Sequence, residues 1–167
     1  ALETRDGGYL ICGESSSGIS GNKTTPGIGK SDLWIVKLDQ KGKTVWQQTY
    51  GGSWVDHMIT AFPDPSGGYV LAGYSWVETD DVRYDSLKGR YDCWLLLIND
   101  KGKVMWEETI GGIHDDILTD AMMDNKGDII LSGYTKITPP GEAGKNSTVQ
   151  NESGVICISP DKKMLWQ

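Results

Sequence analysis

The sequence predicts an all-β fold in which one unit of about sixty residues occurs about three times. The first observation behind this prediction is the composition. The chain of 167 residues contains 22 glycines and 7 tryptophans but only 1 phenylalanine, which is typical of short strands, tight turns and large packing anchors. The second observation is the recurrence of marked residues at a constant interval.

The repeat keeps one register along the whole chain. The residues that recur sixty positions apart are Gly13, Gly73 and Gly133; Trp34 and Trp94; Trp46, Trp106 and Trp166; Gly51-Gly52 and Gly111-Gly112; and Asp56 and Asp116. The third copy has diverged, because Gly154 stands where the first two copies have a tryptophan. Its segment Asp161-Lys162-Lys163 also lacks the glycine that the other copies have there.

Each copy is predicted to form four short strands. In the middle copy they are His57–Pro63, Tyr69–Ser75, Asp92–Ile98 and Val104–Ile110. The segments 64–68 and 99–102 connect them, and their Gly and Asn or Asp residues supply the positive φ angles of hairpin turns. Every residue of the run Trp94–Ile98 is apolar, which indicates a strand buried on both faces.

Four antiparallel strands per unit and a period near sixty favour the blades of a β-propeller. Leucine-rich and hexapeptide solenoids have shorter periods than sixty residues. Helical repeats need a 3.6-residue periodicity, which this sequence does not show. A closed propeller has about 4 to 8 blades, so we expect about three blades of a larger propeller. A homodimer that completes a six-bladed ring is the alternative. We treat the chain as a single segment, 1–167, with repeats of approximately 1–52, 53–112 and 113–167.

The chain resembles a group of known repeats. Asp32–Asp39, Gly42, Trp46–Gly52, Asp56 and Gly67–Ser75 are similar to the tandem propeller-type repeats of secreted and surface proteins of Bacteroidetes and related bacteria. This resemblance covers the whole chain and implies an exported protein. The segment Leu38–Trp46 also resembles the tryptophan-docking repeats of quinoprotein-like propellers, with one residue fewer between the Asp and the Gly-Lys pair.

The charge argues against two classes of partner. A formal net charge of −7 without a Lys/Arg stripe makes nucleic acid a poor partner, and no apolar run reaches the roughly 18 residues of a membrane-spanning helix. Cys12, Cys93 and Cys157 lie in apolar, strand-like stretches without C-x-x-C spacing. We interpret them as small buried hydrophobes.

The long connections after the second strand of each copy are the expected binding face. These connections are Ser16–Ser31, Trp76–Tyr91 and Lys136–Glu152. They keep similar lengths but share almost no sequence, and divergent loops on a constant frame are where repeat proteins bind. The candidate ligand-binding residues are Trp54, Trp76, Tyr84 and Tyr91, whose rings either stack on a ligand or pack the loop against the blade.

Carboxylates on the same face have two further interpretations. Asp80, Asp81 and Asp85, next to Glu78, are weak candidates for holding Ca²⁺, although a solvated acidic loop explains them as well. Asp56 and His57, with the segment 114–116, contain the residue types of acid–base catalysis. Asp56 and Asp116 recur with the repeat, however, and recurrence favours a structural cap over a catalyst.

The function expected from these features is that of a non-catalytic, exported bacterial β-propeller segment that binds protein or glycan. The alternatives are a part of a carbohydrate-active propeller enzyme and a quinoprotein-like assembly scaffold. We expect no cofactor and no catalytic residue. The expected partners are the remaining blades or a second copy, with protein or glycan bound on the loop face. The expected location is extracellular, on the cell surface or periplasmic.

Overall fold

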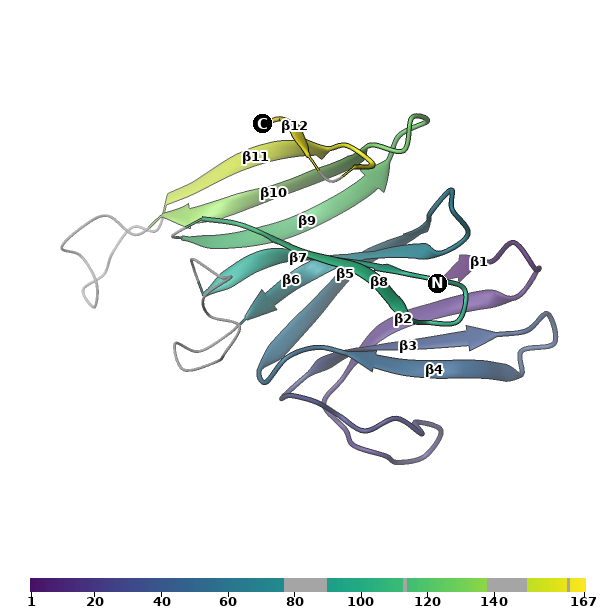
Figure 1. Cartoon of the computed structure of the whole chain (residues 1–167). Coiled ribbons are helices and arrows are strands. Elements are labelled where there is room, and N and C mark those ends of the chain that lie inside the picture. The colour runs from purple at the N-terminus through teal and green to yellow at the C-terminus, as the bar shows by residue number, and fades with distance from the viewer. Residues whose placement is uncertain (77–89, 113, 138–149, 162) are drawn as a thin grey trace.

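The structure is a computed structural model that describes residues 1–76, 90–112, 114–137, 150–161 and 163–167. Within these residues the regular structure consists of β-strands, and they form three four-stranded antiparallel sheets (Figure 1). The expected all-β class and the four-stranded antiparallel sheets are therefore confirmed. In the described part of the chain no sheet closes on itself.

Each sheet is a meander in which consecutive strands are neighbours. Sheet 1 contains β1 (Leu2–Glu3), β2 (Tyr9–Ser15), β3 (Asp32–Leu38) and β4 (Thr44–Tyr50). Sheet 2 contains β5 (Val55–Pro63), β6 (Tyr69–Trp76), β7 (Tyr91–Ile98) and β8 (Val104–Ile110). Sheet 3 contains β9 (Asp115–Met123), β10 (Ile129–Ile137), β11 (Gln150–Ile158) and β12 (Met164–Trp166). The strands predicted in the middle copy are confirmed, and β5 begins two residues before the predicted start.

The short turns have the chemistry that the sequence predicts. Gly42 and Gly102 both have a φ of 77°, a left-handed conformation that glycine adopts without a steric penalty. One side chain ties each turn together. The Asp39 carboxylate accepts hydrogen bonds from the backbone N–H groups of Lys41 and Lys43, at 2.9 and 2.8 Å. Asn99 does the same in the equivalent turn of sheet 2.

The recurring glycine of the second strand has a steric explanation in two of its three copies. A Cβ on Gly73 would lie 1.9 Å from the carbonyl oxygen of His57, and one on Gly133 would lie 2.4 Å from that of Ile117. Both positions lie beside a register shift in the pairing with the first strand, where the two backbones approach closely. Gly13 meets nothing within 4 Å, because β1 pairs only with Tyr9 and Leu10 of β2.

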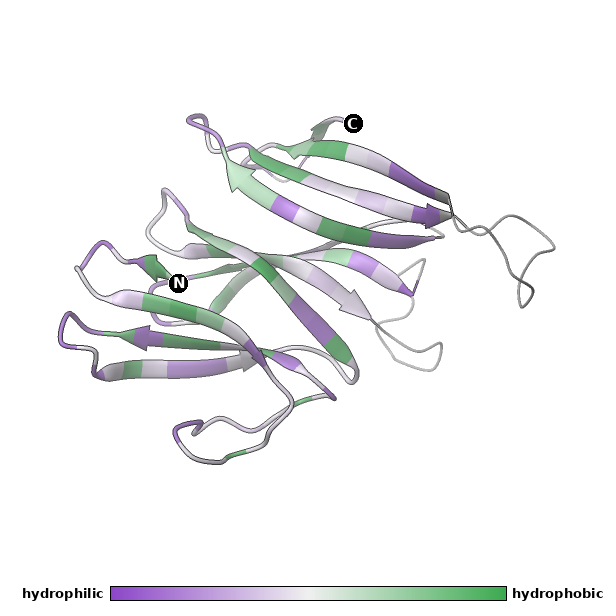
Figure 2. Ribbon diagram, turned by 180° about the vertical axis from the view of Figure 1, so that it is seen from behind, coloured by the Kyte–Doolittle hydropathy of each residue, from purple (hydrophilic) through white to green (hydrophobic). Residues whose placement is uncertain are grey.

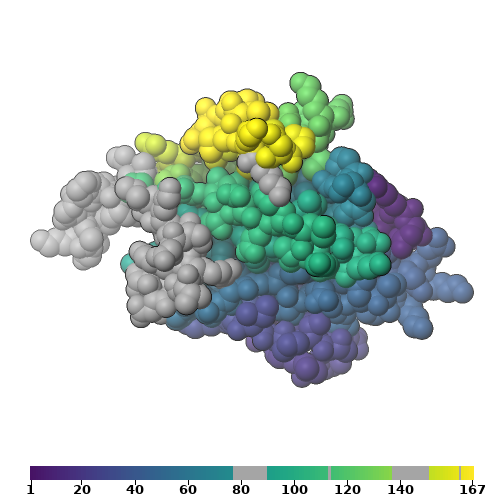
Figure 3. All heavy atoms as spheres, viewed as in Figure 1, coloured from purple at the N-terminus to yellow at the C-terminus, as the bar shows by residue number. Residues whose placement is uncertain are grey.

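Sheet 2 lies between the other two sheets and is buried on both faces (Figures 1 and 3). Alternate residues of β6 and β7 point to opposite sides, as the two-residue period of a strand requires. Toward sheet 1 lie Tyr69, Leu71, Trp94, Leu96 and Ile98, which pack with Leu10, Leu33, Ile35 and Tyr50. Toward sheet 3 lie Val70, Ala72, Cys93 and Leu95, which pack with Leu118, Ala121, Ile129, Leu131 and Ile158. Figure 2 shows hydrophobic stretches along strands of all three sheets.

The two sheet–sheet contacts use equivalent faces. Leu33 and Ile35 of sheet 1 face sheet 2, and the residues sixty positions later, Cys93 and Leu95, face sheet 3. The first strand of each later sheet contacts the second and third strands of the sheet before it: β5 contacts β2 and β3, and β9 contacts β6 and β7. The sheets are therefore stacked by one repeated relation.

The fourth strand of sheet 1 docks on a turn of sheet 2. The indole N–H of Trp46 donates to the carbonyl oxygen of Asp100 at 2.9 Å, and the buried hydroxyl of Tyr50 donates to that of Gly102 at 2.6 Å. Trp106 in the same register packs against the core between sheets 2 and 3. Trp166, the third copy, is 50% exposed. Tryptophan thus joins neighbouring sheets at this position in the first two copies.

A buried lysine holds the turn side of sheet 1 together. Lys37 is 4% exposed, and its ammonium donates to the Thr4 hydroxyl, to the Asp6 carboxylate at 2.9 Å and to the carbonyl of Leu38 at 3.0 Å. The hydrogen bonds from the Thr4 hydroxyl and from Lys37 hold the pKa of Asp6 well below its ordinary value. The burial of Lys37 is thus compensated by several partners.

Candidate functional site

The candidate site lies at the end of sheet 2 where the long connections leave the strands. Trp54 belongs to the link between β4 and β5, Trp76 ends β6 and Tyr91 begins β7. The other predicted residues, Tyr84 as an aromatic ligand and Glu78, Asp80, Asp81 and Asp85 as carboxylates, lie outside the described residues. Three of the four predicted aromatic residues can therefore be placed.

The structure brings these three aromatic rings together. The ring centroids of Trp54 and Trp76 are 5.0 Å apart with an interplanar angle of 67°, an edge-to-face contact. Those of Trp76 and Tyr91 are 6.1 Å apart with an angle of 24°, and the two residues are direct cross-strand partners. Aromatic pairs at such distances add stability beyond their buried area. The mutual contacts of the three rings go beyond the sequence prediction, which named the residues but not their contacts with one another.

The cluster also contains residues that were not predicted from the sequence. The ring of Tyr74 lies 5.8 Å from that of Tyr91, and the ring of His57 lies 4.7 Å from that of Tyr74. The ammonium of Lys30 lies 3.4 Å from the centroid of the Trp54 ring, close enough for a cation–π interaction. The two-residue period of β6, which places Tyr74 on the same face as Trp76, was a signal for Tyr74.

We call this group the aromatic cluster: Lys30, Trp54, His57, Tyr74, Trp76 and Tyr91. Its three predicted rings, Trp54, Trp76 and Tyr91, are half-buried. Each therefore packs against a neighbour and keeps part of its surface in solvent.

Glu14 supplies the negative charge beside the aromatic cluster. Its carboxylate lies 3.3 Å from Nδ1 of His57 and accepts a hydrogen bond from the backbone N–H of Met58 at 2.8 Å. Burial, together with the charge of Glu14, raises the pKa of the Tyr74 hydroxyl, so this phenol is neutral and able to donate a hydrogen bond. One side of the cluster is thus acidic, whereas Lys30 makes the other side basic.

Neither Trp76 nor Tyr91 recurs with the repeat, and His114 stands sixty residues after Trp54. Sixty residues before Trp76 and Tyr91 stand Ser16 and Ser31, and sixty residues after them stand Lys136 and Asn151. Sheets 1 and 3 nevertheless form with the same strand order as sheet 2. The four-stranded sheet therefore does not require aromatic residues at these positions.

Asp56 and Asp116 are caps of the link between sheets, as the recurrence predicts. The fully buried carboxylate of Asp56 accepts hydrogen bonds from the backbone N–H of Gly52, at 2.7 Å, and from the Ser75 hydroxyl. The carboxylate of Asp116 accepts from Gly112 at 2.6 Å and from the Thr135 hydroxyl. Each carboxylate ties the incoming chain to the second strand of the same sheet. The cap interpretation is confirmed.

The cysteines also match their interpretation. Cys93 and Cys157 are buried, Cys12 is half-buried against the core between sheets 1 and 2, and all three thiols are free. Burial raises the pKa of Cys93 to about 12 and that of Cys12 to about 11, so these thiols stay protonated at neutral pH.

Among the described residues, no group of three or more His, Cys, Asp or Glu side chains is arranged to hold a metal ion. In the same part of the chain, no helix has the length and apolar character needed to cross a membrane.

No model of a known protein family matches this chain, and no curated protein matches it significantly.

Proposed function

We propose that the three sheets are consecutive blades of a larger β-propeller and that the chain is a non-catalytic scaffold of an exported bacterial protein, which binds a protein or a glycan through the aromatic cluster. The repeated stacking relation supports the blade arrangement. Equivalent residues and strands are in contact between sheets 1 and 2 and between sheets 2 and 3. Repetition of one such relation around an axis is how a propeller is built.

The observation that carries the binding proposal is the aromatic cluster itself. Half-exposed Trp54, Trp76 and Tyr91 meet at one end of sheet 2, although the sheet does not require aromatic residues there. Tryptophan and tyrosine are enriched in the energetically important centres of interfaces. Their faces and edges also stack on the C–H groups of sugars. The cation of Lys30 and the carboxylate of Glu14 give the cluster polar groups on either side.

The binding proposal is tested with a glycan array and with protein pull-downs from the envelope of the source bacterium. For any ligand found, Trp76→Ala is expected to weaken binding by about tenfold or more, the effect of losing one aromatic anchor. Trp166→Ala is the matched control, since Trp166 is an exposed tryptophan outside the cluster. Blank arrays and pull-downs, or equal effects of the two substitutions, would refute the proposal.

The blade arrangement is tested separately by light scattering. A segment of a larger propeller exposes two sheet faces and is expected to be monomeric or to associate without a fixed stoichiometry. A clean dimer would contradict the segment and support a six-bladed ring made from two copies.

A further inference from the structure

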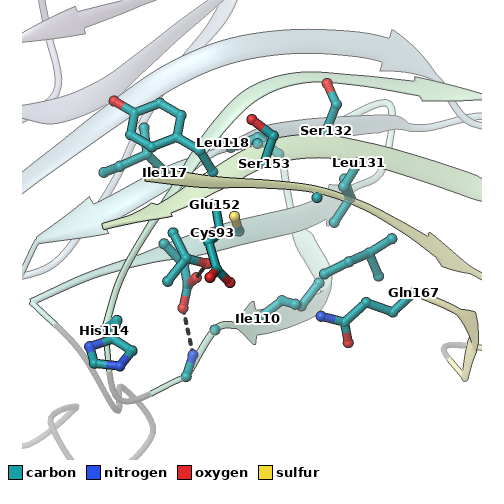
Figure 4. Close-up of a pocket in the computed structure, with 18 of the residues that line it drawn as sticks. Cys93, Ile110, His114, Ile117, Leu118, Leu131, Ser132, Glu152, Ser153 and Gln167 are labelled. Atoms are coloured by element: carbon teal, nitrogen blue, oxygen red, sulfur yellow. Dashed lines mark hydrogen bonds between the residues drawn. The ribbon is translucent and has the colours of Figure 1, made fainter. Parts of the chain in front are cut away.

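A cavity of about 340 Å³ lies between sheets 2 and 3 (Figure 4). Its apolar wall includes Cys93, Ile110, Ile117, Leu118, Leu131 and Ile156. His114, Asp116 and Glu152 line the cavity as well and bring polar groups to it. In Figure 4, His114 and Gln167 lie on opposite sides of the cavity.

The cavity exists because the third copy has a glycine in place of a tryptophan. Trp94 fills the equivalent space between sheets 1 and 2, where it is 4% exposed and packs with Tyr69 and Leu71. Gly154 stands sixty residues after Trp94, and a Cβ built on it would meet nothing within 4 Å. The hollow therefore has the position of a missing indole ring.

The hydrogen-bond acceptor for that indole is still present. The indole N–H of Trp34 donates to Oε1 of Gln47 at 3.2 Å, and that of Trp94 donates to Oε1 of Glu107 at 2.9 Å. The residue in this register in the third copy is Gln167, which lines the cavity. The third copy thus lacks the aromatic ring but keeps a side chain able to accept its N–H.

We propose that this cavity binds a planar heteroaromatic molecule with a ring N–H, of the indole type. Its ring lies over Gly154 between the two sheets, and its N–H donates to the side-chain oxygen of Gln167. The volume is adequate, because a cavity of about 150 Å³ takes up benzene and small-molecule sites begin near 300 Å³. A substituent reaches the carboxylates of Asp116 and Glu152, which favour a cationic group over an anionic one.

The binding experiment is a calorimetric titration of the whole chain with indole, with N-methylindole as the matched probe that lacks the N–H. Indole is expected to bind with a dissociation constant of about 1 mM or lower, which is in reach of a ligand of this size. N-methylindole is expected to bind at least about threefold more weakly, because the hydrogen bond to Gln167 is lost. Tryptamine is expected to bind more tightly than indole, and indolepropionate more weakly.

Variants locate the site. Gly154→Trp places an indole covalently in the cavity and is expected to abolish indole binding while raising the Tm by several degrees. Val155→Trp is the matched control, because Val155 is the next residue of β11, is exposed and does not line the cavity. If Gly154→Trp does not fold, Gly154→Leu reduces the same space and is expected to weaken indole binding.

Three results would overturn the proposal: no saturable indole binding up to roughly ten times the expected dissociation constant, binding that Gly154→Trp leaves unchanged, or equal affinity for indole and N-methylindole. The proposal concerns a contact between two sheets and not the aromatic cluster, so its failure leaves the proposed function untouched.

Discussion

Replacing the recurring glycine of the second strand by alanine has an effect that differs from copy to copy, although the sequence motif is the same. In Gly73→Ala the new Cβ would lie 1.9 Å from the carbonyl oxygen of His57, in Gly133→Ala it would lie 2.4 Å from that of Ile117, and in Gly13→Ala it meets nothing within 4 Å. We therefore expect Gly73→Ala to destabilise the fold most and Gly133→Ala less, whereas Gly13→Ala should not destabilise it.

The size of each change in unfolding free energy follows from the contacts that the added Cβ would make. Real Cβ atoms essentially never come closer than 3.0 Å to a heavy atom outside their own and the adjacent residues, so β5 and β6 must separate in Gly73→Ala. β5 cannot retreat freely, because it also contacts β2, β3 and β9. Overpacking of this kind costs about 1–3 kcal/mol of unfolding free energy. Gly13→Ala instead gains about 0.5–1 kcal/mol, because alanine restricts the unfolded chain without a clash.

Urea unfolding followed by tryptophan fluorescence measures these changes, and thermal unfolding gives a second readout. For a domain of this size, 1 kcal/mol corresponds to about 2–4 °C in Tm, so Gly73→Ala and Gly13→Ala are expected to shift the Tm in opposite directions. An unchanged m value shows that the compactness of the two states is the same in each variant. Equal losses in all three variants would refute the reasoning, because the glycine would then recur for a reason other than the approach of the first strand.

Two further predictions concern side chains. Tyr50→Phe removes the buried hydroxyl that donates to the carbonyl of Gly102 and is expected to lower the free energy of unfolding in urea by about 1–3 kcal/mol. Tyr9→Phe, at a position 44% exposed, should change that free energy by less than about 0.5 kcal/mol. Similar losses in the two variants would contradict the docking role of Tyr50. Because hydrogen bonds lower the pKa of Asp6, its carboxylate contributes stability that is fully present above the unfolded pKa of about 3.9 and is lost as the pH falls through the lower folded pKa. Asp6→Asn should therefore lose less stability than the parent chain when urea midpoints at pH values above and below about 4 are compared, and an identical acid dependence of the two proteins would contradict this.

Much of the fold is predictable because it is encoded locally. The segments ending in Gly42 and Gly102 predict hairpin turns, since an Asp or Asn side chain can cap the backbone and glycine can adopt a positive φ. The continuous apolar run Trp94–Ile98 in β7 predicts burial on both faces, which the two hydrophobic cores show. Interactions between residues a few positions apart need no knowledge of the rest of the chain.

The candidate site was predictable only in part. Divergent loops on a constant frame pointed to Trp54, Trp76 and Tyr91, but not to the contacts that the rings make with one another. Lys30 escaped prediction because it is 24 positions from Trp54 in the sequence. It reaches the ring only because sheets 1 and 2 are joined there, by hydrogen bonds such as that from the N–H of Lys30 to the carbonyl of Trp54.

Gly154 shows the difference between what the sequence determines and what the tertiary structure decides. The sequence by itself determined the repeat, its strands, its turns and the loss of a tryptophan in the third copy. Only the tertiary structure decided that the loss leaves a cavity with Gln167 in its wall. The physical reason is that a missing side chain becomes a cavity only when its neighbours do not close over the space, and those neighbours come from two sheets that are far apart in the sequence.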